Sequence, residues 1–241
     1  MIGIILAAGR GSRLQKLTKR TPKCLIKIDD ESLLEKIIKN FKKNKINKIY
    51  IVTGYKSKLI NFPVVNKICN SKWRSTNIFY SLNCCDRLLR KEECLISYSD
   101  IIYDAKCIKK LILAKEDISI LSNQNWKSLW KKRFKNPLSD LESFKTKGKY
   151  LDSIGNKVNN IKSIEGQFMG LFKIKPSGWK KMKKHQKEEY NNNINKLDIT
   201  SFFKTFIKNK KNKISVKNVR YFWHEIDFNR DYNLARGKIE L

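Results

Sequence analysis

Two glycines and two arginines lie close together near the start of the chain, in the segment LAAGRGSRL at residues 6–14. Gly9 and Gly11 allow a tight turn and let backbone N–H groups approach a ligand, because no Cβ stands in the way. Arg10 and Arg13 offer forked donors that match phosphate oxygens, and a helix starting here would add its positive end. The segment predicts a phosphate-binding loop. The alternative is an ordinary strand-to-helix turn with solvated arginines.

Two acids follow predicted strands that are far apart in the sequence. Asp100 ends ECLISYSD (93–100), and Asp227 ends WHEID (223–227). Both carboxylates are expected at the same edge of a parallel sheet, where they would suit Mg²⁺ bound to substrate phosphates. Glu225, two residues before Asp227, points to the same side of its strand and is a candidate helper. The alternatives are a helix N-cap for Asp100 and a salt bridge with a lysine for Asp227.

Three kinds of phosphate-binding loop begin with glycines of this type. A P-loop requires Gly-x₄-Gly-Lys-Ser/Thr, which the sequence does not contain. A dinucleotide fingerprint requires a third glycine where Leu14 stands, although Asp29 and Asp30 lie at a tolerable distance for a ribose acid, so this alternative stays open. The third kind adds a lysine soon after the loop. Lys23, in TPK at 21–23, provides one.

Strand and helix patterns alternate along the first half of the chain. Continuous apolar runs predict buried strands at 2–8, 48–54, 93–100 and 118–122. Helical spacing predicts helices at 31–43, 76–89 and 104–114, the first with an apolar stripe of Leu33, Leu34, Ile37, Ile38 and Phe41. The alternation predicts an α/β fold with a mostly parallel, Rossmann-like mixed sheet wrapped by helices, and a site at the carboxyl ends of its strands.

The alternation breaks at about 123–175, which is richer in aromatic and turn residues. We expect a lid or acceptor-binding insertion there, within a single domain covering 1–241. The remaining predictions are a strand at 166–175, helices at 177–190 and 198–210, strand character at 213–227 and a closing helix at 229–239. The polar segment YNNNINK (190–196) is predicted to be a mobile loop.

The net charge of +31 at pH 7 is the most extreme bulk property of this 241-residue chain. Such a field attracts nucleic acid, anionic lipid and polyphosphate alike. The lysines, however, are spread through nearly every segment, as expected for solvated faces in a lysine-rich composition, so charge alone decides no function. No apolar run approaches the roughly 20 residues of a membrane-spanning helix. Six cysteines without a CxxC pair are expected to be reduced, in a cytoplasmic protein.

The glycine loop followed by TPK resembles the signature of the sugar-phosphate nucleotidyltransferase superfamily. TGY (53–55), SYSD (97–100) and WHEID match further landmarks of that superfamily in the expected order. Other segments are similar to its phosphocholine cytidylyltransferase-like branch, which is related to an enzyme acting on capsular L-glutamine phosphate. These segments are TNIFYSL (76–82), 126–145, IGNK (154–157) and GQFMGLFK (166–173).

The resemblance implies a GT-A-like nucleotidyltransferase fold and a reaction in which an acceptor phosphate attacks the α-phosphorus of CTP. The acceptor oxygen is already anionic, so the protein needs to supply positioning and charge neutralisation instead of a nucleophile. The implied catalytic residues are Lys23, Arg13, Asp100 and Asp227, the last two as Mg²⁺ ligands. The implied nucleotide-binding residues are Leu6, Ala7, Ala8, Gly9, Gly11, Ser12, Arg13, Lys23, Tyr55, Asn77 and Ser99.

The acceptor is expected to bind in and near the 123–175 segment. Trp126 and Trp130 could hold a quaternary ammonium by cation–π attraction, with Trp179, Trp223 and Tyr190 as further aromatic candidates. The alternative is that these aromatic side chains belong to the core. The predicted acceptor-binding residues are Trp126, Trp130, Arg133, Asp140, Glu142, Lys157 and Gln167.

We therefore expect a cytoplasmic, Mg²⁺-dependent cytidylyltransferase, monomeric or homodimeric, without specific nucleic-acid binding or a transmembrane segment. It would join CMP to a phosphocholine-like or amino-acid phosphate, with release of pyrophosphate, for surface polysaccharide or lipid decoration. One alternative is a nucleotidyltransferase acting on a sugar 1-phosphate. An alternative of another class is a basic protein that binds nucleic acid or a membrane surface.

Overall fold

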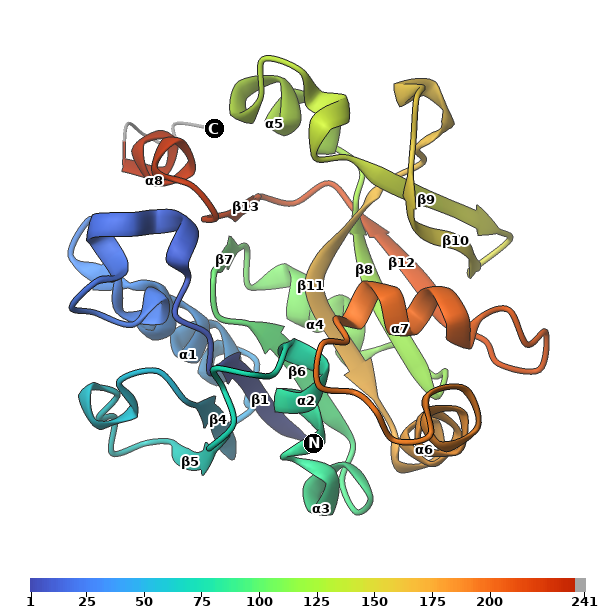
Figure 1. Cartoon of the computed structure of the whole chain (residues 1–241), viewed down its shortest axis with the longest axis horizontal. Coiled ribbons are helices and arrows are strands. Elements are labelled where there is room, and N and C mark those ends of the chain that lie inside the picture. The colour runs from blue at the N-terminus through green and yellow to red at the C-terminus, as the bar shows by residue number, and fades with distance from the viewer. Residues whose placement is uncertain (237–241) are drawn as a thin grey trace.

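A nine-stranded mixed sheet forms the centre of the computed structural model, which describes residues 1–236 (Figure 1). The strand order is β5-β4-β1-β6-β11-β8-β12-β10-β9. The first four strands of this order are parallel, β11 is antiparallel to both of its neighbours, and β8 and β12 are parallel to each other. The bounds are β1 Ile2–Ala7, β4 Ile49–Thr53, β5 Asn66–Cys69, β6 Cys94–Tyr98, β8 Ile118–Asn123, β9 Glu142–Lys147, β10 Tyr150–Lys157, β11 Gln167–Ile174 and β12 Ser215–Val219. The predicted α/β class with a mixed sheet is confirmed.

Helices flank this sheet, with α4 behind it and α7 in front of it in the view of Figure 1. The α-helices are α1 Leu33–Lys43, α2 Ile78–Asn83, α3 Asp86–Leu89, α4 Lys106–Ile112, α5 Trp126–Arg133, α6 Pro176–Tyr190, α7 Ile199–Phe206 and α8 Asn229–Arg236. Short 3₁₀ helices are η1 Ser12–Thr18, η2 Lys23–Leu25, η3 Ser57–Leu59, η4 Pro137–Ser139 and η5 Ile161–Ser163. Among residues 1–236, no helix combines the length and apolarity required to cross a bilayer.

Helix α1 shows how local sequence sets an element. Ser32 and Glu35 form a reciprocal capping box that satisfies backbone donors at the start of the helix. All five residues of the predicted apolar stripe are buried, as expected for the inward face of an amphipathic helix. Strand β1 is buried along its whole length, which explains its continuous apolar sequence.

Three elements differ from the sequence prediction. The helix expected at 76–89 is two short helices, because Cys85 leaves the helical region of backbone space. The strand character at 213–227 divides into β12 and β13 (Trp223–Glu225), and β13 pairs with β7 (Ile101–Tyr103) in a separate two-stranded sheet. A second small sheet joins β2 Lys27–Ile28 to β3 Glu31–Ser32. Residues 237–239 of the predicted closing helix lie outside the described part of the chain.

The segment at 123–175 is closely built into the main sheet. It contains α5, the β9–β10 hairpin at one edge of the sheet, and β11, which lies between β6 and β8 near the centre. A lid function for this segment stays a prediction. The segment at 190–196 starts at the last residue of α6 and leads toward α7, with Asn191 and Asn192 at positive φ. Its mobility also stays a prediction.

Candidate functional site

The glycine loop joins the end of β1 to η1 and forms one wall of a cavity of about 360 Å³. Gly11 has a φ of 72°, and a Cβ placed on it would lie 2.7 Å from the Lys23 side chain. This position therefore requires glycine on two grounds, conformation and close packing. Thr18 Oγ1 donates a hydrogen bond of 2.9 Å to the Gly11 carbonyl and closes the loop. The element after the loop is a 3₁₀ helix, so the α-helix considered from the sequence is absent at 12–18.

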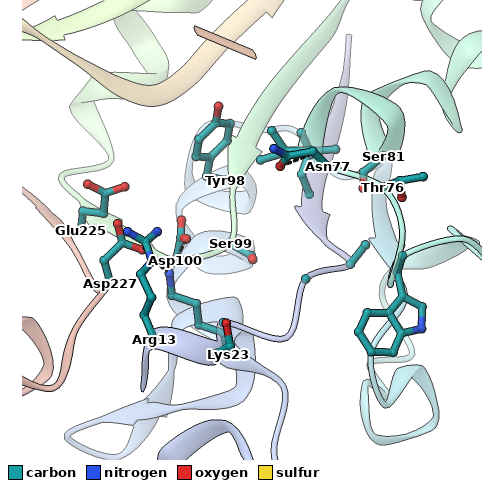
Figure 2. A pocket seen from close by; sticks show the side chains of 17 residues that line it. Arg13, Lys23, Thr76, Asn77, Ser81, Tyr98, Ser99, Asp100, Glu225 and Asp227 are labelled. Carbon is teal, nitrogen blue, oxygen red and sulfur yellow. Dashed lines mark hydrogen bonds and ion pairs between the residues drawn. The ribbon is translucent and has the colours of Figure 1, made fainter. Parts of the chain in front are cut away.

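Lys23 lies between the two predicted carboxylates (Figure 2). Its Nζ atom is 2.6 Å from Asp100 Oδ2 and 2.7 Å from Asp227 Oδ1. Arg13 also contacts Asp227, with its Nη2 atom 3.0 Å from Asp227 Oδ1. Burial by itself lowers the pKa of Lys23, but the attraction of Asp100 and Asp227 outweighs it and raises the pKa. The ammonium group is thus a fixed positive charge in the wall of the cavity.

The two carboxylates meet by a route that the sequence did not reveal. Asp100 follows β6 of the main sheet, as predicted, but Asp227 follows β13 of the two-stranded sheet. The two sheets are joined because the chain runs from β6 through Asp100 directly into β7, which pairs with β13. Ile226 N also donates to the Asp100 carbonyl at 2.9 Å. The prediction that Asp100 and Asp227 leave one parallel sheet is wrong, although their side chains do converge.

The donor set fits a divalent cation. Asp100 Oδ1 is buried and has no hydrogen-bond partner among residues 1–236, so one carboxylate oxygen is free to accept a ligand beside Asp227. The described residues contain no cluster of three or more His, Cys, Asp or Glu side chains arranged for a metal. Two carboxylates alone are typical of a site where the remaining positions are taken by water and substrate phosphates.

Glu225 adds a third acid to the same cavity. Burial, followed by repulsion from Asp227 and Asp100, raises the pKa of Glu225 to about 8. Its surroundings in the metal-free protein therefore favour the protonated form of Glu225.

This shift predicts how stability depends on pH. An acid whose pKa is raised by folding contributes stability that is complete below its unfolded value, about 4.3, and is lost as pH rises through the folded value of about 8. In EDTA, we expect the urea midpoint of the wild type to fall between pH 5 and pH 8 more steeply than that of Glu225→Gln. Equal slopes for the two proteins would show that Glu225 does not ionise in this range.

Comparison with known proteins places this geometry in a family. Residues 3–151 match the family model described as a MobA-like NTP transferase domain. The chain belongs to this nucleotidyltransferase family. It is 36% identical to a CTP:phosphoglutamine cytidylyltransferase of Campylobacter jejuni over 99% of this chain and 100% of that protein. It is 38% identical to a choline-phosphate cytidylyltransferase of Streptococcus pneumoniae, over 41% of this chain and 42% of that protein.

A solved structure shows the same fold. The CTP:phosphocholine cytidylyltransferase from Streptococcus pneumoniae superposes with a TM-score of 0.74 at 20% identity, over 98% of this chain and 97% of that one. Nucleotidyltransferases of this family generally use a divalent metal. In this chain Asp100 and Asp227 are the residues that would hold it, and its chemistry would be to neutralise charge on the triphosphate.

Most of the predicted nucleotide-binding residues of this nucleotidyltransferase line the cavity. Ala7 and Tyr55 do not: Ala7 is buried in β1, and the Tyr55 hydroxyl donates to the Lys19 carbonyl at 2.7 Å. Those that line it are Leu6, Ala8, Gly9, Gly11, Ser12, Arg13, Lys23, Asn77 and Ser99, together with the predicted metal-binding residues Asp100 and Asp227. Sequence reasoning missed Trp73, Thr76, Ile78, Ser81 and Tyr98. The position of Trp73 in a short polar loop between β5 and α2 is the one signal that could have indicated a ligand contact.

The predicted acceptor residues divide into two groups. Glu142 and Gln167 line a smaller cavity of about 110 Å³, which shares Tyr98 and Glu225 with the first cavity. Asp140 and Lys157 line neither cavity, and Lys157 is exposed opposite Glu142 in the β9–β10 hairpin.

The aromatic cage expected from Trp126 and Trp130 is wrong. These side chains are 1% and 4% exposed, and Trp130 stacks on Trp223 within the core at 5.8 Å. Trp179 is fully buried, and Tyr190 stacks on Phe202 beside α7. Arg133 is 1% exposed and paired with the buried Asp231, so its guanidinium cannot contact an acceptor. The core alternative is correct because each of these side chains packs inward.

Proposed function

We propose that this protein is a Mg²⁺-dependent cytidylyltransferase that transfers CMP from CTP to a small phosphorylated acceptor carrying an ammonium group. The observation that carries the proposal is the Lys23–Asp100–Asp227 cluster, which lines the same cavity as the glycine loop. The near full-length similarity to a CTP:phosphoglutamine cytidylyltransferase supports CTP as the donor.

In the proposed reaction, an acceptor phosphate oxygen forms a bond to the α-phosphorus of CTP, and the bond from that phosphorus to the bridging oxygen of pyrophosphate breaks. Negative charge moves from the acceptor to the leaving pyrophosphate. Lys23, which packs against Gly11, and Arg13, in the glycine segment itself, would neutralise this charge as it develops. The backbone N–H groups of the loop would position the phosphates. Asp100 and Asp227 would hold the Mg²⁺, with Glu225 beside them.

The smaller cavity supports an ammonium-bearing acceptor. Glu142 and Glu225 line it, and Asp198 lies near enough to influence Glu142. Burial, then repulsion from Asp198 and Asp140, raises the pKa of Glu142, and the attraction of Lys204 does not offset them. A bound ammonium group would favour the ionised form of Glu142. Phosphoglutamine and phosphocholine, the acceptors in the names of two relatives, both carry a positively charged nitrogen. A sugar 1-phosphate has no such group.

Pyrophosphate release tests this function directly. The enzyme is mixed with each of four nucleoside triphosphates and with phosphoglutamine, phosphocholine or glucose 1-phosphate. We expect release to require Mg²⁺ and CTP, and to be at least about tenfold faster with an ammonium-bearing acceptor, the equivalent of about 1.4 kcal/mol of discrimination. Equal rates with glucose 1-phosphate would contradict the acceptor class. Release only with another triphosphate would contradict the donor.

We further propose that the enzyme works in the cytoplasm, as a monomer or homodimer, and supplies an activated group for surface polysaccharide or lipid. Retention of full activity at a salt concentration that abolishes nucleic-acid binding would separate this role from the basic-protein alternative, because such binding weakens steeply with salt.

A further inference from the structure

A buried ion pair connects α5 to α8 directly behind the carboxylates of the site. Arg133 Nε is 3.0 Å from Asp231 Oδ1, and Arg133 Nη2 is 3.2 Å from Asp231 Oδ2. Both side chains are completely enclosed. Enclosing two charges in the interior is costly, so a pair with this two-pronged geometry calls for an explanation beyond stability.

Asp231 fixes the backbone that carries Asp227. Asp231 Oδ2 accepts hydrogen bonds from Asp227 N at 2.9 Å and from Phe228 N at 2.8 Å. The Asp231 carbonyl is also 2.9 Å from His224 Nε2. The segment between β13 and α8 is therefore held at both ends by one residue, and the Asp227 side chain points from it to Lys23 and Arg13.

Arg133 extends the same network to Glu225. Its Nη1 atom is 3.4 Å from Glu225 Oε2, and its guanidinium lies over the rings of Trp130 and Phe134 at 4.8 and 5.1 Å. One rigid, permanently charged group thus contacts Asp231 on one side and Glu225 on the other. The stacked rings leave it little freedom to move.

A simple helix cap accounts for only part of this arrangement. An acid at the third position of a helix commonly accepts from the N-cap backbone, as Asp231 does from Phe228 N. A cap does not require the added bond to Asp227 N, nor a buried arginine located 98 residues earlier in the chain. These additional contacts all lead to acids that line the nucleotide cavity.

We propose that Asp231 and Arg133 are positioning residues, which hold Asp227 and Glu225 in the orientation needed for the metal-bound triphosphate. This inference rests on the proposed function. Groups that orient metal ligands from behind commonly change metal affinity or activity by about 10- to 100-fold when removed.

The test uses Asp231→Asn, which keeps the size of the side chain but places an amide beside the Arg133 guanidinium. Calorimetry measures the binding of an α,β-methylene CTP analogue in Mn²⁺ and in EDTA. We expect Asp231→Asn to weaken binding in Mn²⁺ by about 10- to 100-fold and to change binding in EDTA by less than about threefold. We also expect kcat for pyrophosphate release to fall with little change in the KM of the acceptor.

Glu93→Gln is the matched control, because Glu93 pairs with buried Lys173 at 2.6 Å where β11 ends, away from the cavity. It should lower the melting temperature without changing Mn²⁺-dependent binding. If Asp231→Asn does not fold, Arg133→Lys is the second variant. It keeps the charge but loses the forked contact, so we expect a several-fold weakening that again depends on Mn²⁺.

The outcomes separate this inference from the proposed function. If the wild type binds the analogue in Mn²⁺ and a folded Asp231→Asn or Arg133→Lys binds it equally well, the positioning role is overturned. If either variant weakens binding equally in Mn²⁺ and EDTA, the pair is only structural. If the wild type neither binds the analogue nor releases pyrophosphate from CTP, the proposed function itself is wrong, and the inference falls with it.

Discussion

Replacing Asp100 with asparagine is expected to lower kcat for pyrophosphate release by about 1,000-fold, equivalent to about 4 kcal/mol of transition-state stabilisation. Asp100 Oδ1 is the buried oxygen without a partner among residues 1–236, and Oδ2 contacts Lys23. The amide is neutral and therefore a much poorer ligand for a hard divalent cation. The measurement is steady-state pyrophosphate release at saturating CTP and acceptor.

The Asp100 variant should remain folded, because Lys23 keeps its ion pair with Asp227. Asp104→Asn is a matched control: Asp104 follows β7, and its side chain accepts a hydrogen bond from Lys106 N, which an asparagine can also accept. We expect the control to retain the wild-type rate. A rate for Asp100→Asn within about threefold of the control would show that Asp100 holds no essential cation.

Replacing Lys23 with methionine is expected to lower kcat by about 100- to 1,000-fold, the usual effect of removing one preorganised charge donor from a transition state. Because methionine has a similar length, the packing of the side chain against Gly11 should be preserved. The KM for CTP should change less than kcat, since Arg13 and the loop N–H groups still contact the phosphates in the proposed complex. Single-turnover rates at saturating CTP separate the two quantities.

Lys23→Met is expected to lower kcat but to increase the stabilisation of the protein by a divalent cation. Without Lys23, Asp100 and Asp227 face each other with less positive charge between them, so the metal-free protein should melt at a lower temperature. Added Mn²⁺ should then raise the melting temperature more in Lys23→Met than in the wild type. Lys42→Met, an exposed change in α1, is the control. If Lys23→Met has the wild-type kcat and the wild-type rise in melting temperature with Mn²⁺, Lys23 has no role in catalysis or cation binding.

The parts of the site that depend on local chemistry were predictable. The backbone at residue 11 has a positive φ and lies in close contact with Lys23, so this position requires glycine. Such a local requirement can be recognised directly in the sequence. Asp100 follows a strand whose first four residues are buried, as the apolar residues at 94–96 indicate. The burial of the α1 stripe follows from its spacing in the same way.

The parts that depend on distant pairing were not predictable. Nothing local indicates that β13 leaves the main sheet to pair with β7, because strand pairing is decided by contacts across more than 100 residues. Arginine is a residue type that often binds anionic ligands, so the sequence alone favours a binding role for Arg133. Only the ion pair with Asp231 on another helix shows that the Arg133 side chain is buried. The four-residue spacing of Trp126 and Trp130 places both on one helix face, which favours core packing over a cage.

The position of Lys23 has a consequence for how the substrates assemble. With no ligand bound, its ammonium group serves as a tethered counter-ion for Asp100 and Asp227. A free cation would have to compete with Lys23 for these carboxylates, whereas an incoming triphosphate would offer the ammonium group a new anionic partner and so free both carboxylates. Nucleotide and cation should therefore promote each other's binding, and by linkage the benefit is equal in both directions. On the proposed function, a single lysine would thereby make the enzyme respond to the cation–nucleotide complex in preference to either component alone.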